Sequence, residues 1–417
     1  MGFFNLSAIL ITLSAAFAYI NTRFIRLPRA IGLMLISLIF SLLLIAAGKF
    51  SPLFAHDARA LVESVDFEKA VLNGMLSFLL FAGALHVNLH DLARSKWTIL
   101  ILAAPGTVLS AIIVAVAMQA TFTLFGAHVD FIYCLLFGAL ISPTDPIAVL
   151  GLLKSLGVPK ELQTKITGES LMNDGVAVVL FLGLLGVLTG EHNLEAGMFM
   201  ELFLIEAGGG ILLGLLLGYM GHILCKGVDD YIVEVLITLA IVMGGYSLSE
   251  FLHTSGPLAM VMAGLLMGNH SRELAMSERT RERVDGFWEM IDEIFNAVLF
   301  VLIGLEVLII SLETIYLEAG LIAIPIVLLA RLVAVSIPVT SLRHLRPFPK
   351  GSVAIMTWGG LRGGVSVALA LALPPGEGRD LVLTMTYTVV IFSILVQGLT
   401  LRFLIPKQED PTAPLAD

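Results

Sequence analysis

Thirteen stretches of mostly apolar residues, most of them about 20 residues long, run through this 417-residue chain. A helix of about 20 residues spans the hydrocarbon of a bilayer, and only helices or closed barrels satisfy the backbone there. Hydrophobic residues make up 58% of the chain and charged residues 14%, whereas soluble domains carry about 25% charged residues. We therefore expect an all-α polytopic membrane protein with about 13 transmembrane helices. The stretches cover residues 3–20, 30–48, 67–86, 97–125, 131–153, 164–189, 197–225, 231–252, 256–268, 287–310, 316–341, 349–373 and 381–404.

The positive charges alternate between the two sides of these spans. We count a residue at the end of a stretch with the adjoining connection. Of the 24 Lys and Arg residues, eighteen then fall in every second connection and the C-terminal tail region, four fall in the intervening connections, and two, Arg331 and Arg362, lie well inside spans. Cytoplasmic loops of membrane proteins carry the excess of Lys and Arg. This asymmetry predicts a multi-pass protein of the cell (inner) membrane, with its N-terminus outside and its C-terminus in the cytoplasm. Arg23, Arg26 and Arg29 follow the first stretch and no positive charge precedes it, so we interpret it as a span rather than a signal peptide.

The fifth span contains Ser142-Pro143-Thr144-Asp145-Pro146. Each proline removes a backbone donor and clashes with the preceding helical turn, so we expect the helix to break here. Broken helices in transporters direct free carbonyls and helix ends at an ion site near the bilayer midplane. A simple proline kink is the alternative interpretation, and the adjacent Asp145 favours the ion site.

The sixth span carries polar residues in the sequence Gly-Glu-Ser-Leu-Met-Asn-Asp-Gly at 168–175. Ser170 and Asp174 are four residues apart and therefore share a helix face, as do Glu169 and Asn173. Hard cations such as sodium prefer carboxylate, hydroxyl and carbonyl oxygens. We expect Ser170 and Asp174 to bind one cation, although a structural ion pair would also explain the buried acids Glu169 and Asp174.

The twelfth span reads Trp-Gly-Gly-Leu-Arg-Gly-Gly-Val at 358–365, with four glycines around Arg362. This composition predicts local unwinding or close helix packing. Broken helices 5 and 12 lie seven spans apart and so run in opposite directions. That relation indicates inverted repeats, with spans 1–6 related to spans 8–13 and the seventh span as connector.

In combination these three motifs resemble the CPA1 group of monovalent cation/proton antiporters, the NhaP-like sodium/proton antiporters related to the animal sodium/proton exchangers. The resemblance covers nearly the whole chain, and the Asn173-Asp174 pair is similar to the electroneutral branch of the group. It implies a secondary active transporter rather than an enzyme, with no cofactor, that alternates access between the two sides. Sodium or lithium would exchange for protons, which compete with sodium for Asp174.

The resemblance also implies a role for individual residues. Sodium, the substrate, would bind at Asp145, Ser170 and Asp174, with further contacts from Thr144 and Asn173. Glu169 would form a structural ion pair with Arg331 of the eleventh span, and Arg362 would give electrostatic support. Glu250, His253, Ser255 and Gly256 resemble a Glu-x-x-His-x-Ser-Gly stretch of the exchangers, which makes Glu250 and Ser255 possible accessory residues. Relatives often have an acid late in the third span, where this chain has His86, either a structural hydrogen-bonded histidine or an accessory residue.

We expect one transmembrane antiporter domain over residues 1–407. Its core or transport part would cover about 97–189 and 316–404, its dimerisation or scaffold part about 1–86 and 231–310, and its connector helix about 197–225. Residues 408–417 are predicted to form a short disordered tail. The 272–285 segment has charges of alternating sign, and we expect it to form a solvated helix or loop, with a pH sensor as the alternative. The family implies a homodimer in contact with membrane lipid, active in pH homeostasis, and we expect no nucleic-acid partner.

Two alternatives remain at this stage. A potassium/proton antiporter would use the same carboxylates, and the sequence does not choose between the cations. An intramembrane aspartyl protease would also need two buried carboxylates. Its Gly-x-Gly-Asp type of stretch does not occur in the chain, which favours transport.

Overall fold

The computed structural model describes residues 3–48, 69–145, 150–151, 153, 157–190, 196–271, 276–308, 313–342, 348–349 and 351–405. Within these ranges the chain is helical and has no β-strand. Short π-helical or 3-10 segments adjoin the α-helices at Asn21–Ile25, Lys69–Met75, Met267–Ser271, Ser393–Gln397 and Leu401–Phe403. The predicted disordered tail, 408–417, lies outside the described residues.

The α-helices are α1 (Phe3–Ile20), α2 (Arg29–Gly48), α4 (Leu76–Leu85), α5 (Leu89–Ala103), α6 (Pro105–Leu124), α7 (Phe131–Ile141), α9 (Lys160–Thr189), α10 (Ala196–Lys226), α11 (Tyr231–Phe251), α12 (Gly256–Leu266), α14 (Glu278–Glu306), α15 (Thr314–Leu342), α16 (Ser352–Trp358), α17 (Gly364–Leu371), α18 (Glu377–Phe392) and α19 (Gly398–Thr400).

Every one of the thirteen predicted stretches contains helix. Eight helical segments within the described residues are long and apolar enough to cross a membrane by length and composition. The other five stretches hold the shorter helices α4, α7 and α12, the charged helix α14, and the interrupted pair α16 and α17. The fold is therefore that of a multi-pass membrane protein.

Two helices begin earlier than their apolar stretches predict. The Asn88 side chain accepts hydrogen bonds from the backbone N–H groups of His90 and Asp91, so α5 starts at Leu89 rather than near residue 97. The Ser277 side chain likewise accepts a hydrogen bond from the Thr280 N–H and starts α14 at Glu278 rather than near residue 287. In both cases a polar cap extends the helix beyond its apolar part. Within the 272–285 segment, residues 272–275 lie outside the described residues, and the first turns of α14 account for the rest from Glu278 on.

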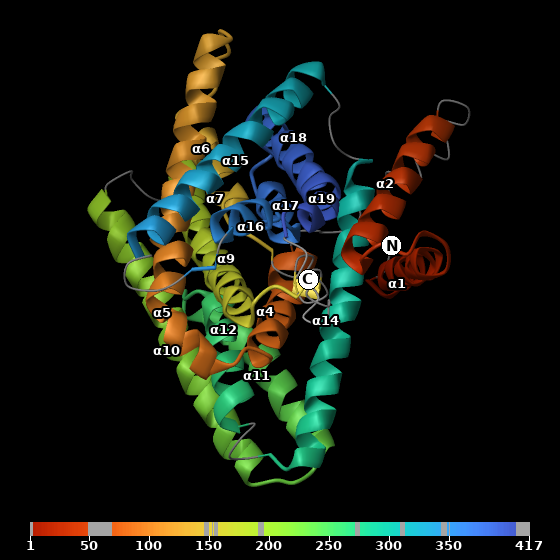
Figure 1. Ribbon diagram of the computed structural model, residues 1–417, viewed down its shortest axis with the longest axis vertical. Helices are drawn as coiled ribbons and strands as arrows, with labels where there is room; N and C mark the ends of the chain where they lie inside the picture. The colour runs from red at the N-terminus through yellow and green to blue at the C-terminus, as the bar shows by residue number, and fades with distance from the viewer. Residues whose placement is uncertain are drawn as a thin grey trace, which may run out of the picture.

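The helices pack in two groups that meet at α9. In Figure 1, α15, α16, α17 and α18 lie above α9, and α11 and α12 lie below it. The core group consists of α5, α6, α7, α9, α15, α16, α17 and α18, and the scaffold group consists of α1, α2, α4, α10, α11, α12 and α14. Contacts between the groups run from α9 to α4, α10 and α12 and from α17 to α14. The helix predicted as a connector, α10, packs mainly against α11 and α12 of the scaffold group. A large apolar cluster joins α14 to α7, α17 and α18, so the two groups share one buried interface.

Candidate functional site

The two interrupted spans meet inside the core group. The fifth span leaves helical geometry after Ile141, and the twelfth does so between Trp358 and Gly364. The backbone N–H of Asp145 donates a hydrogen bond of 2.8 Å to the Leu361 carbonyl, which links the two unwound segments directly. The predicted breaks at helices 5 and 12 are thus present, and they lie against each other. Pro146 is outside the described residues, whereas Pro143 sits in the non-helical segment.

A buried arginine caps the carbonyl end of each half-helix. Arg362 Nη1 donates to the carbonyls of Ser142 and Pro143, the latter at 2.7 Å, just beyond the end of α7. Arg331 of α15 donates from Nε and Nη2 to the Met356 carbonyl of α16, at 3.4 and 3.3 Å. Helix ends leave carbonyls without intrahelical partners and carry partial negative charge, which the guanidinium groups offset. Both arginines are buried, at 2% and 6% exposure, so their charges act in a poorly screened environment.

Arg331 also forms a buried ion pair with Glu169 of α9 through Nη1 and Oε1. Glu169 is fully buried, and the pair ties α9 to α15. The residues are 162 positions apart, so spacing in the sequence alone could not have brought them together. The pairing that the family resemblance implied is present in the structure.

The polar residues of α9 reach the unwound segment through Thr144. Thr144 Oγ1 lies 2.9 Å from Ser170 Oγ and accepts a hydrogen bond of 3.0 Å from Asn173 Nδ2. Ser170, Asn173 and Thr144 are all buried. Their oxygens are the uncharged ligands that a cation without its water shell needs.

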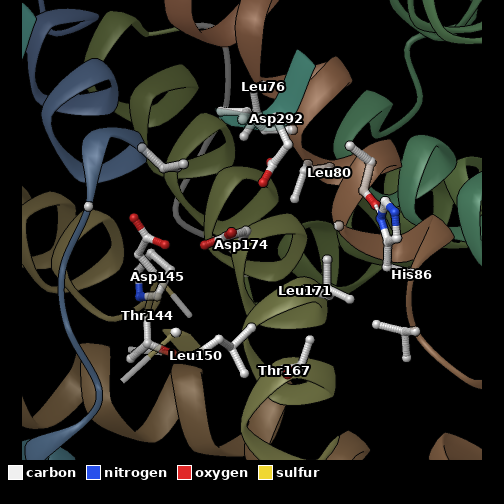
Figure 2. A pocket seen from close by; sticks show the side chains of 18 of the residues that line it. Leu76, Leu80, His86, Thr144, Asp145, Leu150, Thr167, Leu171, Asp174 and Asp292 are labelled. Carbon is white, nitrogen blue, oxygen red and sulfur yellow. Dashed lines mark hydrogen bonds between the residues drawn. The ribbon is translucent and has the colours of Figure 1, made fainter. Parts of the chain in front are cut away.

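The carboxylates of Asp145 and Asp174 point toward each other at the floor of a cavity of about 710 Å³ (Figure 2). They are close enough to interact electrostatically, and Arg362 acts on Asp174 with the opposite sign. Asp145 lies against the start of α17, because a Cβ added at Gly363 would lie 2.3 Å from Asp145 Oδ2. The missing side chain at Gly363 therefore gives the carboxylate its space. Two facing carboxylates that line a cavity can hold one cation or a proton.

The cavity leads from these carboxylates to the N-terminal ends of α5 and α9 and to the first half of α14. Its wall there carries Asp91, Lys160, Glu289 and Glu293. Asp91 and Lys160 form a salt bridge of 3.1 Å, and Glu293 pairs with Arg29 at 2.6 Å. Three of the four charged residues on this wall are thus acids, and two of them are paired with cations.

A third carboxylate, which sequence analysis left out, faces the cavity from the scaffold group. Asp292 of α14 points toward Asp174 in Figure 2 and interacts electrostatically with Asp145. Asp292 falls near the predicted start of the tenth span, where a charge is easily attributed to the water interface. The available signal was the spacing of Glu289, Asp292 and Asn296, which places polar residues on one helical face.

Three residues considered as accessory groups have other positions. His86 lines the cavity wall, but its Nδ1 lies 2.8 Å from the Ala82 carbonyl of its own helix, and Figure 2 shows it apart from the two facing carboxylates. Ser255 is the N-cap of α12, where its Oγ accepts from the Leu258 N–H at 3.4 Å. Glu250 is exposed near the end of α11. Neither Glu250 nor Ser255 is among the residues that line the cavity.

Comparison with known proteins agrees with this architecture. The family model described as "Sodium/hydrogen exchanger, transmembrane" matches residues 11–407. The chain belongs to the sodium/hydrogen exchanger family. It is therefore a secondary transporter rather than an enzyme.

Individual relatives match over nearly their full lengths. The chain is 48% identical over 408 residues to the Na⁺/H⁺ antiporter NhaP of Pseudomonas aeruginosa, covering 97% of this chain and 96% of the relative. It is 38% identical over 388 residues to the Na⁺/H⁺ antiporter NhaH of Halobacillus dabanensis, with 91% and 92% coverage. Among solved structures, the sodium proton antiporter MjNhaP1 of Methanocaldococcus jannaschii superimposes with a TM-score of 0.75 at 19% identity, covering 95% of this chain and 96% of that one. This likeness shows that the present chain has the same fold as that antiporter.

Proposed function

We propose that this protein exchanges sodium or lithium for protons across the cell (inner) membrane, with the two ions competing for Asp174. The observation that carries the proposal is the facing pair Asp145 and Asp174 at the floor of a cavity where two interrupted spans meet. The cation would take oxygens from Asp145, Ser170 and Asp174, with Thr144 and Asn173 holding the ligands in place. Relatives named as sodium/proton antiporters support the choice of ions.

The balance of buried charge supports an electroneutral cycle. Asp145, Asp174 and Glu169 carry three negative charges when ionised, and Arg331 and Arg362 carry two positive ones. One bound sodium ion or one bound proton then makes the site neutral. An unpaired charge in a low-dielectric environment costs several kcal/mol, so the loaded site would move easily while the empty site would not. This difference would enforce exchange of one ion for one ion.

The two helix groups supply the moving parts for alternating access. The site residues Asp145, Ser170, Asp174, Arg331 and Arg362 all belong to the core group, which corresponds to the expected transport part. The core group would move against the scaffold group, whose outer helices would form a homodimer in the lipid. The cavity opens beside the positively charged connections that we assign to the cytoplasm, so this conformation would face inward.

Transport in proteoliposomes tests the proposal. Sodium, lithium or potassium chloride is added outside vesicles with an acidic interior, and a pH-sensitive dye reports proton efflux. We expect sodium and lithium to dissipate the gradient in the native protein and in Glu282→Gln, an exposed α14 carboxylate away from the cavity. Asp174→Asn should insert and purify normally but show no exchange. Normal sodium-dependent flux in a well-folded Asp174→Asn variant would refute the mechanism.

The same vesicles separate the remaining alternatives. Dissipation by potassium alone would indicate a potassium/proton antiporter with the same carboxylates. An imposed membrane potential should leave the sodium-driven rate unchanged, because the loaded site is neutral. A rate that follows the potential would instead show that net charge crosses in each cycle.

A further inference from the structure

Asp292 is a carboxylate that the scaffold group, not the core group, directs toward the candidate site. It lies on α14 of the scaffold group, and its side chain lines the cavity and points toward Asp174 (Figure 2). Asp145 is near enough to act on it electrostatically. At this point of the cavity Asp292 of the scaffold group thus faces Asp145 and Asp174 of the core group.

Contacts along α14 fix Asp292 to the scaffold group. Trp288 Nε1 donates a hydrogen bond of 3.0 Å to Thr238 Oγ1 of α11. The Ser41 hydroxyl of α2 donates to the Gly304 carbonyl at 2.8 Å. The exposed pair Arg29–Glu293 joins α2 and α14 one residue beyond Asp292. These contacts on both sides of Asp292 tie its position to α2 and α11 of the scaffold group.

The charges around Asp292 are mainly negative. Among the described residues no Lys or Arg forms a salt bridge with it, and its electrostatic neighbours are acids together with the amide of Asn296. Lys160 at the opposite wall is engaged by Asp91. The titratable or charged groups that line the cavity are His86 of α4, Asp91 of α5, Asp145 after α7, Lys160 and Asp174 of α9, and Glu289, Asp292 and Glu293 of α14.

We propose that Asp292 makes the cation affinity of the transport site higher on the side to which this cavity opens than on the other side. This inference rests on the proposed exchange and on movement of the core group against the scaffold group. In the conformation described here the carboxylate of Asp292 attracts a cation toward Asp145 and Asp174. When the core group moves away to open the opposite side, that attraction is lost. Asp292 is a positioning residue, because it acts through space on an ion that the core group binds.

The size and the pH dependence of the effect follow from electrostatics. Removing one unit charge several ångströms away in a partly hydrated cavity should weaken cation affinity about threefold to tenfold. A proton and a sodium ion carry the same charge, so Asp292 favours both equally. At acidic pH most unloaded sites hold a proton. Loss of the Asp292 charge then weakens binding of the competing proton by the same factor as binding of sodium, so the apparent KM for sodium hardly changes. At alkaline pH, where protons compete little, the full change in sodium affinity should be visible.

The experiment measures the apparent KM for sodium from each side of oriented vesicles. The cavity side is identified with a membrane-impermeant thiol reagent and a Thr164→Cys variant, since Thr164 lines the cavity and both native cysteines are buried. We expect Asp292→Asn to raise the KM at pH 8.5 about threefold to tenfold on the cavity side only, with the maximal rate retained. The effect should shrink at pH 6 and at high concentrations of an inert salt, and Asp292→Glu should restore the native KM.

Controls separate this inference from the proposed function. Glu282→Gln removes the same charge from an exposed position on the same helix and should leave the KM unchanged on both sides. The native protein and Asp174→Asn run in parallel, and loss of flux only in the latter verifies exchange independently of Asp292. A KM for Asp292→Asn that is unchanged on the cavity side, or raised equally on both sides, would overturn the inference. So would a rise in KM that is the same at both pH values, because a merely structural disturbance would act in that way.

Discussion

Asn173 of α9 holds Thr144 of the interrupted fifth span at two points. Its Nδ2 donates to Thr144 Oγ1 at 3.0 Å, and its Oδ1 accepts from the Thr144 backbone N–H at 3.4 Å. Both residues are buried, so water does not compete for these hydrogen bonds. The contact fixes the non-helical backbone next to Asp145 relative to the helix that carries Asp174. The distance between the two carboxylates therefore depends on an uncharged amide.

Breaking this contact should destabilise the protein. Asn173→Ala removes both hydrogen bonds and leaves the Thr144 N–H without a partner, at an expected cost of about 1–3 kcal/mol. Thr144→Val removes the hydroxyl while keeping the side-chain shape. In a double-mutant cycle the two changes should show a coupling of about 0.5–3 kcal/mol, measured by thermal unfolding in detergent. Strictly additive effects would argue that the two side chains act independently.

The Glu169–Arg331 pair makes a different prediction. Removing one partner leaves a buried charge uncompensated and should cost about 3–5 kcal/mol, whereas removing both costs much less. Glu169→Gln and Arg331→Gln should each lower the melting temperature more than the double variant does. Arg331→Gln should be the more damaging single change, because Arg331 also caps the Met356 carbonyl. Melting curves in detergent test this order, and a double variant that loses the sum of both effects would contradict direct pairing.

Space at Gly363 should be essential for cation binding. An added Cβ would lie 2.3 Å from Asp145 Oδ2 and 2.8 Å from Asp145 Cβ, so Gly363→Ala must displace that carboxylate. Its backbone φ of −122° suits alanine, so the effect would come from crowding rather than from strain. We expect the KM for sodium to rise about tenfold or more in proteoliposomes. Gly286→Ala on α14 meets no atom within 4 Å and should keep native transport while stabilising the helix by about 0.5–1 kcal/mol.

Competition at one carboxylate fixes the form of the pH dependence. While Asp174 is mostly protonated, one proton must leave for each sodium ion bound, so each step to lower pH should weaken the apparent sodium affinity about tenfold per unit. Once Asp174 is mostly ionised the affinity should be constant, and scarce protons then limit the return half of the cycle. The transport rate should therefore pass through a maximum between pH 5 and pH 9, measured with equal pH on both sides. A sodium affinity that does not change on the acidic side would require separate sites for the two ions.

Most of the fold could be predicted from local sequence. Hydropathy located all thirteen stretches, since a bilayer imposes the length of its spans. The prolines at 143 and 146 and the glycines around Arg362 predicted the breaks, because they act on their own backbone. Helical spacing alone put Ser170 and Asp174 on one face of α9.

The rest depended on tertiary contacts. Nothing near Arg362 in the sequence indicates that it donates to the Ser142 and Pro143 carbonyls, 220 and 219 positions away. The Ser277 cap starts α14 at Glu278, earlier than the predicted start of the tenth span. Asp292, which the prediction placed near the start of that span, therefore lies well within a helix that borders the cavity. Glu250 and Ser255 matched a family pattern, but Glu250 lies exposed near the end of α11 and Ser255 caps the start of α12, and neither lines the cavity.

At the end of α14 remote from the cavity, three buried polar atoms make no hydrogen bond within the part of the chain that the structure describes: Glu306 Oε2, Tyr387 Oη and Arg379 Nε. Glu306 interacts electrostatically with both Arg379 and Tyr387. If the core group moves as proposed and exposes this end, water would gain access to groups that hydrogen-bond it readily, rather than to hydrocarbon alone. Hydration there would offset part of the apolar area uncovered. This end of the fold is thus already suited to becoming wet, which would bring the two end states of the proposed movement closer in free energy.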